Sequence, residues 1–296
     1  MARKAYHPLS YLRAQTSRLH TTTLQDDLKE AAEALPTVEM RQVIYFDKLL
    51  TGTILEERNG MIVLQFVASV PGEQASTLPT KNIDKQQVAL GTMDAPEGHD
   101  FSDGDLICLV QDDDIFVCCS AMRDDMLYPF LVRLFEKMGK DVQDDNWALG
   151  LVRGANKNVM NHIQKYGIKS IQLTATTNAQ ALSNYSAKED GNFLQRFFAR
   201  DLSLLENVKS SGAKVCLTIS RTRFNRANFE WLEAEAQTIL TGDADYVIET
   251  MDNQVFKPND MIIRQRKQFT PFGKSVFLEE AVEKLKEFRC YVQDNG

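Results

Sequence analysis

The chain has 296 residues, of which 43% are hydrophobic and 25% charged, and these values are typical of a folded protein rather than a disordered one. No uncharged run approaches the roughly 20 residues that a membrane-spanning helix needs, and the N-terminal residues 1–8 contain no apolar leader segment. We therefore expect a cytoplasmic protein with reduced, buried cysteines and a length that suits two domains.

The charge is unevenly distributed along the chain, although the net charge is only −7. Residues 151–226 carry 12 Lys and Arg against 4 Asp and Glu, a net charge of +8, whereas residues 101–150 carry 4 against 11, a net charge of −7. Residues 1–100 (10 against 13) and 227–296 (8 against 13) are mildly acidic. Because charges act over about 10 Å at 0.1 M salt, the basic block could still bind a phosphate-bearing partner.

The first half of the chain predicts an antiparallel sheet with helices packed on it. Its predicted elements are a helix over 24–35 capped by Thr23, a hairpin over 40–50 and 61–69, an irregular segment over 71–104, a hairpin over 106–110 and 115–119, and a helix over 126–138. Both arms of the second hairpin are continuously apolar, which predicts that both faces of the sheet are covered.

The second half also mixes helices and strands, and the acidic segment 141–146 is the best candidate for a domain boundary. Its predicted elements are a helix over 155–166, a strand over 168–176, a helix over 192–209, a strand over 214–220, a helix over 226–240, strands over 246–250 and 261–266, and a terminal helix with Val282, Leu285, Phe288 and Val292 on one face. The predicted fold class is α+β with two domains, 1–148 and 149–296, each a largely antiparallel sheet covered by helices.

Sequence signatures of enzymes are missing. The chain contains no Walker-A loop, Gly-x-Gly-x-x-Gly, His-Glu-x-x-His, Cys-x-x-Cys or Gly-x-Ser-x-Gly motif, and its four histidines are scattered. Acidic clusters such as 112–114 could hold a divalent cation, but they fit turns and helix starts better. In a nuclease pattern built on Asp245 and Glu249, Met251 stands where a lysine is needed. We expect no enzyme activity, metal or cofactor.

Arginines alternate with other residues near the end of the chain. In the strand predicted over 261–266, Arg264 and Arg266 point to one side and Ile263 to the other. Two strand steps separate guanidinium groups by about 6.6 Å, which is close to the phosphate spacing along one nucleic-acid strand, about 7 Å. An exposed edge strand protected by charge against aggregation is the alternative interpretation.

Three segments resemble the RexA family of phage-exclusion proteins. Residues 151–162, with Arg153-Gly154, Lys157, Val159-Met160 and His162, are similar to the central segment of that family. Phe101-Ser102-Asp103-Gly104-Asp105-Leu106 is similar to its acidic strand entry, and Ile263-Arg264-Gln265-Arg266-Lys267 to its basic strand. The resemblance implies a homodimeric, two-domain protein of antiviral defence that binds double-stranded DNA without sequence preference. It also implies a hinge, near Asp260, between the domains.

The predicted function is sequence-independent DNA binding through the phosphate backbone, without membrane insertion and with a possible operon partner protein. The predicted DNA-binding residues are Arg264, Arg266, Lys267, Arg221, Arg223, Arg226, Arg153 and Lys157. Two alternatives stay open: a protein-interaction module of a defence operon, in which the acidic residues 100–150 bind a basic partner or mimic DNA, and a metal-dependent nuclease with unidentified carboxylates.

Overall fold

The computed structural model of the chain describes residues 5–16, 22–77, 91–140, 148–176, 214–220 and 245–295. Contacts between residues divide the chain into two compact units: residues 1–154 with 263–296 form unit 1, and residues 155–262 form unit 2. Unit 2 is therefore an insertion in the sequence of unit 1. The sequence suggested one boundary after residue 148, whereas the contacts place the two chain connections at 154/155 and 262/263.

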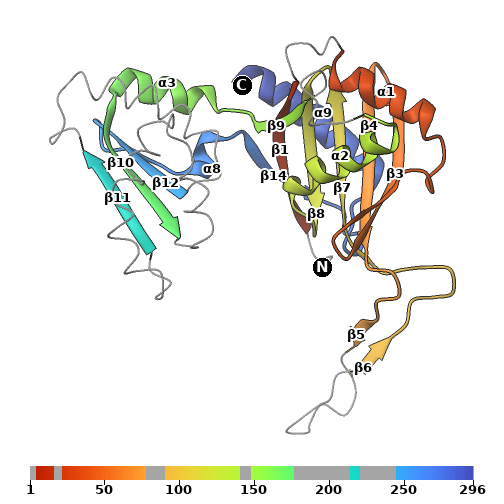
Figure 1. Cartoon of the computed structure of the whole chain (residues 1–296). Coiled ribbons are helices and arrows are strands. Elements are labelled where there is room, and N and C mark those ends of the chain that lie inside the picture. The colour runs from red at the N-terminus through yellow and green to blue at the C-terminus, as the bar shows by residue number, and fades with distance from the viewer. Residues whose placement is uncertain are drawn as a thin grey trace, which may run out of the picture. The chain divides into compact units, whose positions relative to one another are not determined.

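Unit 1 is built on an eight-stranded antiparallel sheet with the strand order β14-β1-β8-β7-β4-β3-β2, in which β9 also pairs with β1 (Figure 1). Its elements are β1 (Ala5–Thr16), α1 (Leu24–Ala34), β2 (Gln42–Tyr45), β3 (Lys48–Arg58), β4 (Met61–Ser69), β5 (Ala75–Thr77), β6 (Gly91–Met93), β7 (Ser102–Gln111), β8 (Asp114–Ser120), the 3-10 helix η1 (Asp124–Met126), α2 (Leu127–Lys137), β9 (Leu149–Arg153), β14 (Arg264–Phe269) and α9 (Leu278–Asn295). Strands β5 and β6 form a separate two-stranded ribbon.

Helices cover both faces of this sheet. Helices α1 and α2 lie on one face, where Leu28 and Phe130 join a buried cluster with Phe66 of β4. Helix α9 lies on the other face, where Phe288 packs with Phe116 of β8. Because side chains alternate between the faces of a strand, continuously apolar strands such as β7 and β8 serve both clusters. The prediction that both faces of the second hairpin are covered is confirmed.

The α+β class, the helices α1, α2 and α9 and the strands β4, β7 and β8 agree with the sequence prediction. One difference concerns the first hairpin. The segment predicted as one strand over 40–50 is divided by a tight turn at Phe46 and Asp47, because Phe46 adopts a φ of 54°. A second difference is a shift of the last strand from 261–266 to 264–269, since a short helix α8 (Pro258–Met261) occupies the start of the predicted segment.

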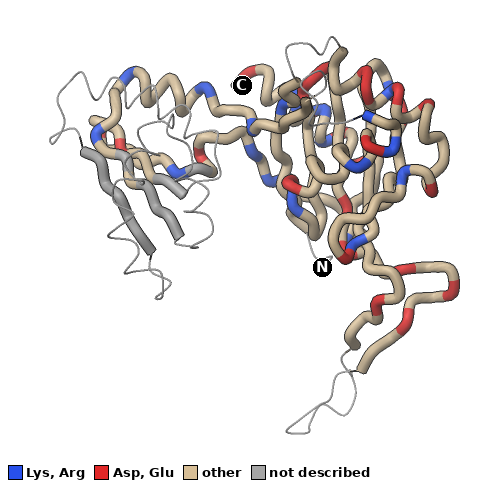
Figure 2. The backbone as a smooth tube through the Cα atoms, viewed as in Figure 1, with Lys and Arg blue, Asp and Glu red and all other residues tan. Residues whose placement is uncertain are grey.

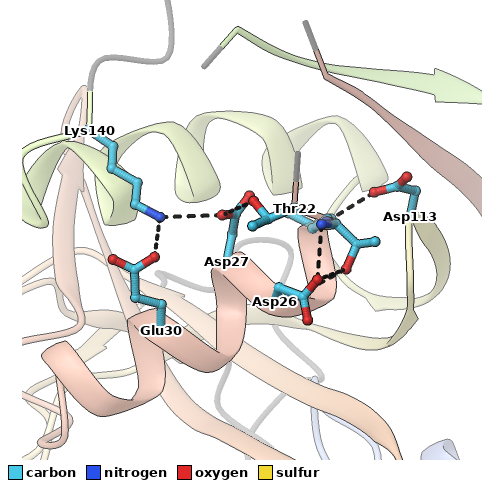
Figure 3. Close-up of polar contacts among 8 residues, drawn as sticks. Thr22, Asp26, Asp27, Glu30, Asp113 and Lys140 are labelled. Carbon is cyan, nitrogen blue, oxygen red and sulfur yellow. Dashed lines mark hydrogen bonds and ion pairs between the residues drawn. The ribbon is translucent and has the colours of Figure 1, made fainter. Parts of the chain in front are cut away.

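The start of α1 is fixed by polar contacts to distant parts of unit 1 (Figure 3). Thr23 caps the helix and exchanges hydrogen bonds with Asp26, as its sequence position predicted. The Asp113 carboxylate accepts a hydrogen bond of 2.9 Å from the Leu24 N–H, which ties the helix start to the β7–β8 turn. Lys140, after α2, pairs with the buried carboxylate of Asp27 at 3.3 Å.

Unit 2 contains a four-stranded antiparallel sheet in the order β11-β10-β12-β13. Its described elements are α3 (Lys157–Tyr166), β10 (Ile168–Thr176), β11 (Lys214–Ser220), β12 (Asp245–Thr250), β13 (Val255–Phe256) and α8. The first of these helices and the strands β10, β11 and β12 were predicted. The helices expected over 192–209 and 226–240, and the boundary segment 141–146, lie outside the described residues.

Candidate functional site

At one edge of the main sheet, β9 and β14 pair one after the other with β1. The residues of unit 2 lie between these two strands in the sequence. The C-terminal half of β1 pairs with β9, and its N-terminal half pairs with β14, on the same side and in the same direction. Tyr11 lies between the two halves: its carbonyl accepts a hydrogen bond from the Gly154 N–H at 3.0 Å, and its N–H donates to the Ile263 carbonyl at 3.3 Å. The chain thus leaves the edge after Gly154 and returns to it at Ile263.

Position 154, where the chain leaves the edge, requires a glycine because the Tyr11 ring occupies the space beside it. A Cβ atom at Gly154 would lie 1.9 Å from the Cδ1 atom of Tyr11. The ring itself is held in place: it stacks on Phe116 at 5.5 Å, and its hydroxyl donates to the Asp114 carboxylate at 2.6 Å. Burial and this hydrogen bond raise the pKa of Tyr11, so its hydroxyl stays a donor.

Three arginines follow one another along this edge, and we call them the arginine row. Arg153 of β9 lies opposite Leu12, and Arg264 and Arg266 of β14 lie opposite Ser10 and Pro8. These three partners alternate along β1, so the row falls on one face of the sheet, the face that carries α1 and α2. Successive members are therefore separated by about 6.6 Å, two strand steps, although 110 residues of sequence separate Arg153 from Arg264. Figure 2 marks the basic residues of β14 in blue.

A buried carboxylate holds the first two members of the row together. The Asp124 side chain, in η1, is only 9% exposed. Its Oδ1 atom accepts from the Arg153 guanidinium at 3.3 Å and its Oδ2 atom accepts from the Arg264 guanidinium at 3.2 Å. About a third of each arginine side chain stays exposed, 35% and 34%. Asp124 therefore bridges two positive charges, and both arginine side chains stay partly open to solvent.

Arg266 and Lys267 lie on opposite faces of β14. Arg266 is exposed and, among the residues that the structure describes, no carboxylate pairs with it. Lys267 lies on the face of α9, where its ammonium group is 3.7 Å from the Glu287 carboxylate. The alternation predicted for Arg264, Arg266 and Ile263 is confirmed, because Ile263 is buried in the cluster beneath α9. Lys267 does not belong to the arginine row.

The remaining predicted site residues belong to unit 2 or lie outside the described residues. Lys157 is exposed in the first turn of α3. Asp260, the expected hinge residue, lies in α8 three residues before unit 1 resumes, and its carboxylate accepts from the Lys257 N–H at 2.9 Å. Arg221, Arg223 and Arg226 fall in a segment, 221–244, that is not described.

His162 has a partner that its sequence position did not reveal. Its Nε2 atom lies 3.0 Å from the Asp252 carboxylate, and its ring packs against Tyr166 and Phe256. Asp252 also accepts a hydrogen bond from the Thr250 hydroxyl, which lowers the pKa of this carboxyl group. These contacts join α3 to the turn after β12, a structural role within unit 2.

No candidate metal centre is formed by the described residues, since no group of three His, Cys, Asp or Glu side chains meets among them. Cys108, Cys118 and Cys119 are free and buried, as predicted, and burial raises the pKa of Cys118 to about 12. Cys290 is free but exposed. Within the described residues, no helix combines the length and the apolar character that crossing a membrane requires.

Comparison with known proteins adds no relative: no family model, curated protein or solved structure matches the chain. The arginine row is accordingly described from its own geometry. Sequence reasoning named its three members but missed Asp124, which lies 29 residues from Arg153 and 140 residues from Arg264 along the chain. A pair of acids after the β8 strand, Asp124 and Asp125, gave no signal that one of them is buried.

Proposed function

We propose that the arginine row binds the phosphate backbone of double-stranded DNA without sequence preference. The observation that carries this proposal is the register of Arg153, Arg264 and Arg266 along β1. It sets three arginines on one face, and their backbone positions have nearly the spacing of successive phosphates. A guanidinium group offers a planar pair of donors that matches a phosphate. Backbone contacts fix the position of a protein on the duplex and carry no sequence information.

The electrostatics of the row support an anionic ligand. Three arginines lie on a short stretch of edge and Asp124 pairs with two of them, within a chain of net charge −7. Asp124 orients two of the guanidinium groups before any ligand arrives, which reduces the entropy lost on binding. Their partial exposure leaves donors available to a phosphate. Arg266 extends the row beyond the reach of Asp124.

Carboxylates of the acidic segment favour DNA binding over a DNA-mimic function. Several of them already bind groups within unit 1. Asp103 pairs with Lys48, Asp113 accepts from the Leu24 N–H, Asp114 accepts from Tyr11, and Asp124 pairs with the two arginines. An acidic surface that imitates DNA needs carboxylates that face solvent. We assign these four carboxylates a structural role.

The wider proposal follows the family resemblance. It includes two domains, each a helix-covered antiparallel sheet, that act as a homodimer in cytoplasmic antiviral defence without enzymatic activity. Lys157 and the segment with Arg221, Arg223 and Arg226 would supply further phosphate contacts from unit 2. Asp260 would lie at the hinge, next to the chain connection at 262/263.

A double substitution tests the row directly. We expect Arg264→Ala with Arg266→Ala to weaken binding to unrelated duplexes by the same factor, about tenfold or more, because lost phosphate contacts affect all sequences alike. The slope of log K against log salt should become shallower by about 1.8, since each neutralised phosphate contributes about 0.9. Fluorescence anisotropy with two duplexes across a salt series measures both quantities.

The matched control is Lys29→Ala with Arg58→Ala, which also removes two positive charges. Lys29 and Arg58 pair with Glu57 and Glu56 away from β14. We expect this control to retain wild-type affinity and salt slope. Equal losses in the two double variants would show that overall charge, and not the arginine row, determines binding. Unchanged binding in the β14 variant would remove the row from the interface.

A further inference from the structure

We propose that the free edge of the main sheet at β2 is the surface through which two copies of this chain associate. This proposal rests on the homodimer proposed above and names its surface, and it does not depend on DNA binding. Four large apolar side chains are exposed within nine residues of the β2 hairpin: Val38 (41%), Met40 (41%), Ile44 (72%) and Phe46 (84%). Single exposed apolar residues are common on protein surfaces, but a cluster of this kind marks an interaction site.

The two edges of the main sheet differ in the charged side chains that they carry. The edge formed by β9 and β14 carries the arginine row and Lys267, and charged side chains of this kind prevent edge-to-edge pairing. The edge formed by β2, with the sequence Gln42-Val43-Ile44-Tyr45, contains no charged residue and no proline. Of the two edges, only β2 lacks the usual protection against pairing with another strand.

Among the described residues, the main-chain N–H and carbonyl groups of Ile44 have no hydrogen-bond partner. The Gly52 N–H donates to the Arg41 carbonyl, so these two residues form a bonded pair between the strands. Bonded pairs alternate along an antiparallel ladder, and the next ones are Val43 with Leu50 and Tyr45 with Lys48. The N–H and carbonyl groups of Ile44 therefore point away from β3. The Gln42 N–H, by contrast, already donates to the Glu39 carbonyl.

The free N–H and carbonyl groups of Ile44 can pair with the same groups of a second copy of the chain. A two-fold axis through Ile44 pairs each Ile44 with its own counterpart, so that both N–H groups donate and both carbonyl groups accept. The charges of residues 38–48 cancel, because Glu39 and Asp47 oppose Arg41 and Lys48. Two copies of a chain with a net charge of −7 repel one another in general, whereas this neutral, apolar segment approaches itself without that cost.

A groove lies between β2 and α2, beside the proposed interface. The groove has a volume of 390 Å³ and is lined by Gln42, Val43, Ile44, Arg133, Glu136 and Lys137. Pairing centred on Ile44 sets Phe46 of one copy, just beyond the end of β2, opposite Gln42 of the other. Burial of an aromatic side chain is the typical energetic centre of a protein interface.

The oligomeric state of the full chain tests this surface without DNA. We expect the wild type to sediment as a dimer at micromolar concentration. Ile44→Lys sets two ammonium groups against each other at the two-fold axis and should raise the dimer dissociation constant by more than about tenfold. Phe46→Asp should act in the same direction. The matched control is Val255→Lys, since Val255 is 53% exposed on β13, the edge of the other sheet, and it should remain dimeric.

A crosslinking experiment tests the register. Residues of a bonded pair have Cα atoms about 5.5 Å apart, within the range that a disulfide spans. In a Cys290→Ser background, Ile44→Cys should form a disulfide-linked dimer under mild oxidation, and Val255→Cys should not. A wild type that stays monomeric up to about 100 μM would overturn the proposal. So would a dimer that Ile44→Lys leaves intact, or equal crosslinking of the two cysteine variants, because both outcomes place the contact elsewhere.

Discussion

Asp105 is a carboxylate that the fold removes from water. Its side chain accepts hydrogen bonds from Ser275 at 2.6 Å and Gln65 at 3.0 Å, but both reach Oδ2, and Oδ1 is buried without a hydrogen-bond partner among the described residues. Burial raises the pKa of Asp105, while these hydrogen bonds and the nearby His7 oppose the rise. The folded protein therefore binds a proton at Asp105 more tightly than the unfolded chain does.

This shift predicts a pH dependence of stability with a definite sign. Because the folded state holds the proton more tightly, the contribution of Asp105 is most favourable below the pKa of the unfolded carboxyl group, about 3.9. It is lost as the pH rises through the higher pKa of the folded state. We expect Asp105→Asn to remove this loss, so that its stability relative to the wild type improves as the pH rises from 4 to 7.

Urea unfolding at several pH values measures the effect, and Glu97→Gln, which neutralises an exposed carboxylate, is the control for loss of charge. A difference between Asp105→Asn and the wild type that is constant over this pH range would contradict the assigned cause. The sequence did not single out Asp105 as buried, because Phe101-Ser102-Asp103-Gly104-Asp105 looks like a polar strand entry. The side chains that surround Asp105 come from residues 65 and 275.

Local patterns succeeded at other single residues. The Thr23 cap and the common side of Arg264 and Arg266 depend only on neighbours in the sequence, and both were predicted. The surroundings of Asp124 depend on strands β9 and β14, and those of Lys267 on helix α9, all distant in the sequence. Glu287 of α9 determines the surroundings of Lys267, and this contact has no local sequence signal.

At the scale of elements, the interrupted edge strand depends on Gly154. We expect Gly154→Ala to lower the free energy of unfolding by more than about 2 kcal/mol, because the new methyl group would overlap the fixed Tyr11 ring. Gly150→Ala, in the same strand, is the matched control. Its Cβ atom would lie 3.7 Å from the nearest atom, the Gln15 carbonyl oxygen, so the change should be within about 1 kcal/mol and stabilising.

Thermal and urea unfolding of both glycine variants compares the two sites. The double variant Tyr11→Ala with Gly154→Ala separates steric overlap from other effects, since removal of the ring should make the added methyl group less costly. Equal destabilisation by Gly150→Ala and Gly154→Ala would show that strand propensity, and not the approach of Tyr11, limits this position.

Strands β1 and β9 were not predicted from the sequence. β1 contains Pro8, Ser10 and Arg13 among its apolar residues, so it has no clear alternation. β9 has only five residues. Both strands are stabilised by pairing over long sequence distances, as β1 pairs with β14 near the other end of the chain. Strands made by such pairing are stabilised by neighbours rather than by intrinsic propensity. The β7–β8 hairpin, in contrast, is local and strongly apolar, and it was predicted.

At the scale of the whole molecule, the net charge of sequence segments and the register of the strands identify different basic residues. The +8 block over 151–226 contains Arg153, but Arg264 and Arg266 come from the acidic segment 227–296. They join Arg153 because residues 263–296 return to unit 1 after the insertion of unit 2. Charge counted over windows of sequence could not predict this row, since it is assembled by the register of β1 with two strands.

The most direct test of the arginine row as a backbone-binding site is the salt dependence of DNA affinity in the wild-type chain. Dissociation constants for two duplexes of equal length and unrelated sequence should agree within about threefold at each salt concentration. Between about 50 and 200 mM salt, the slope of the logarithm of the association constant against log salt should be −2 or steeper, since three arginines can neutralise up to three phosphates. An affinity that does not change with salt would contradict phosphate binding by this edge. So would strong binding to only one of the two duplexes.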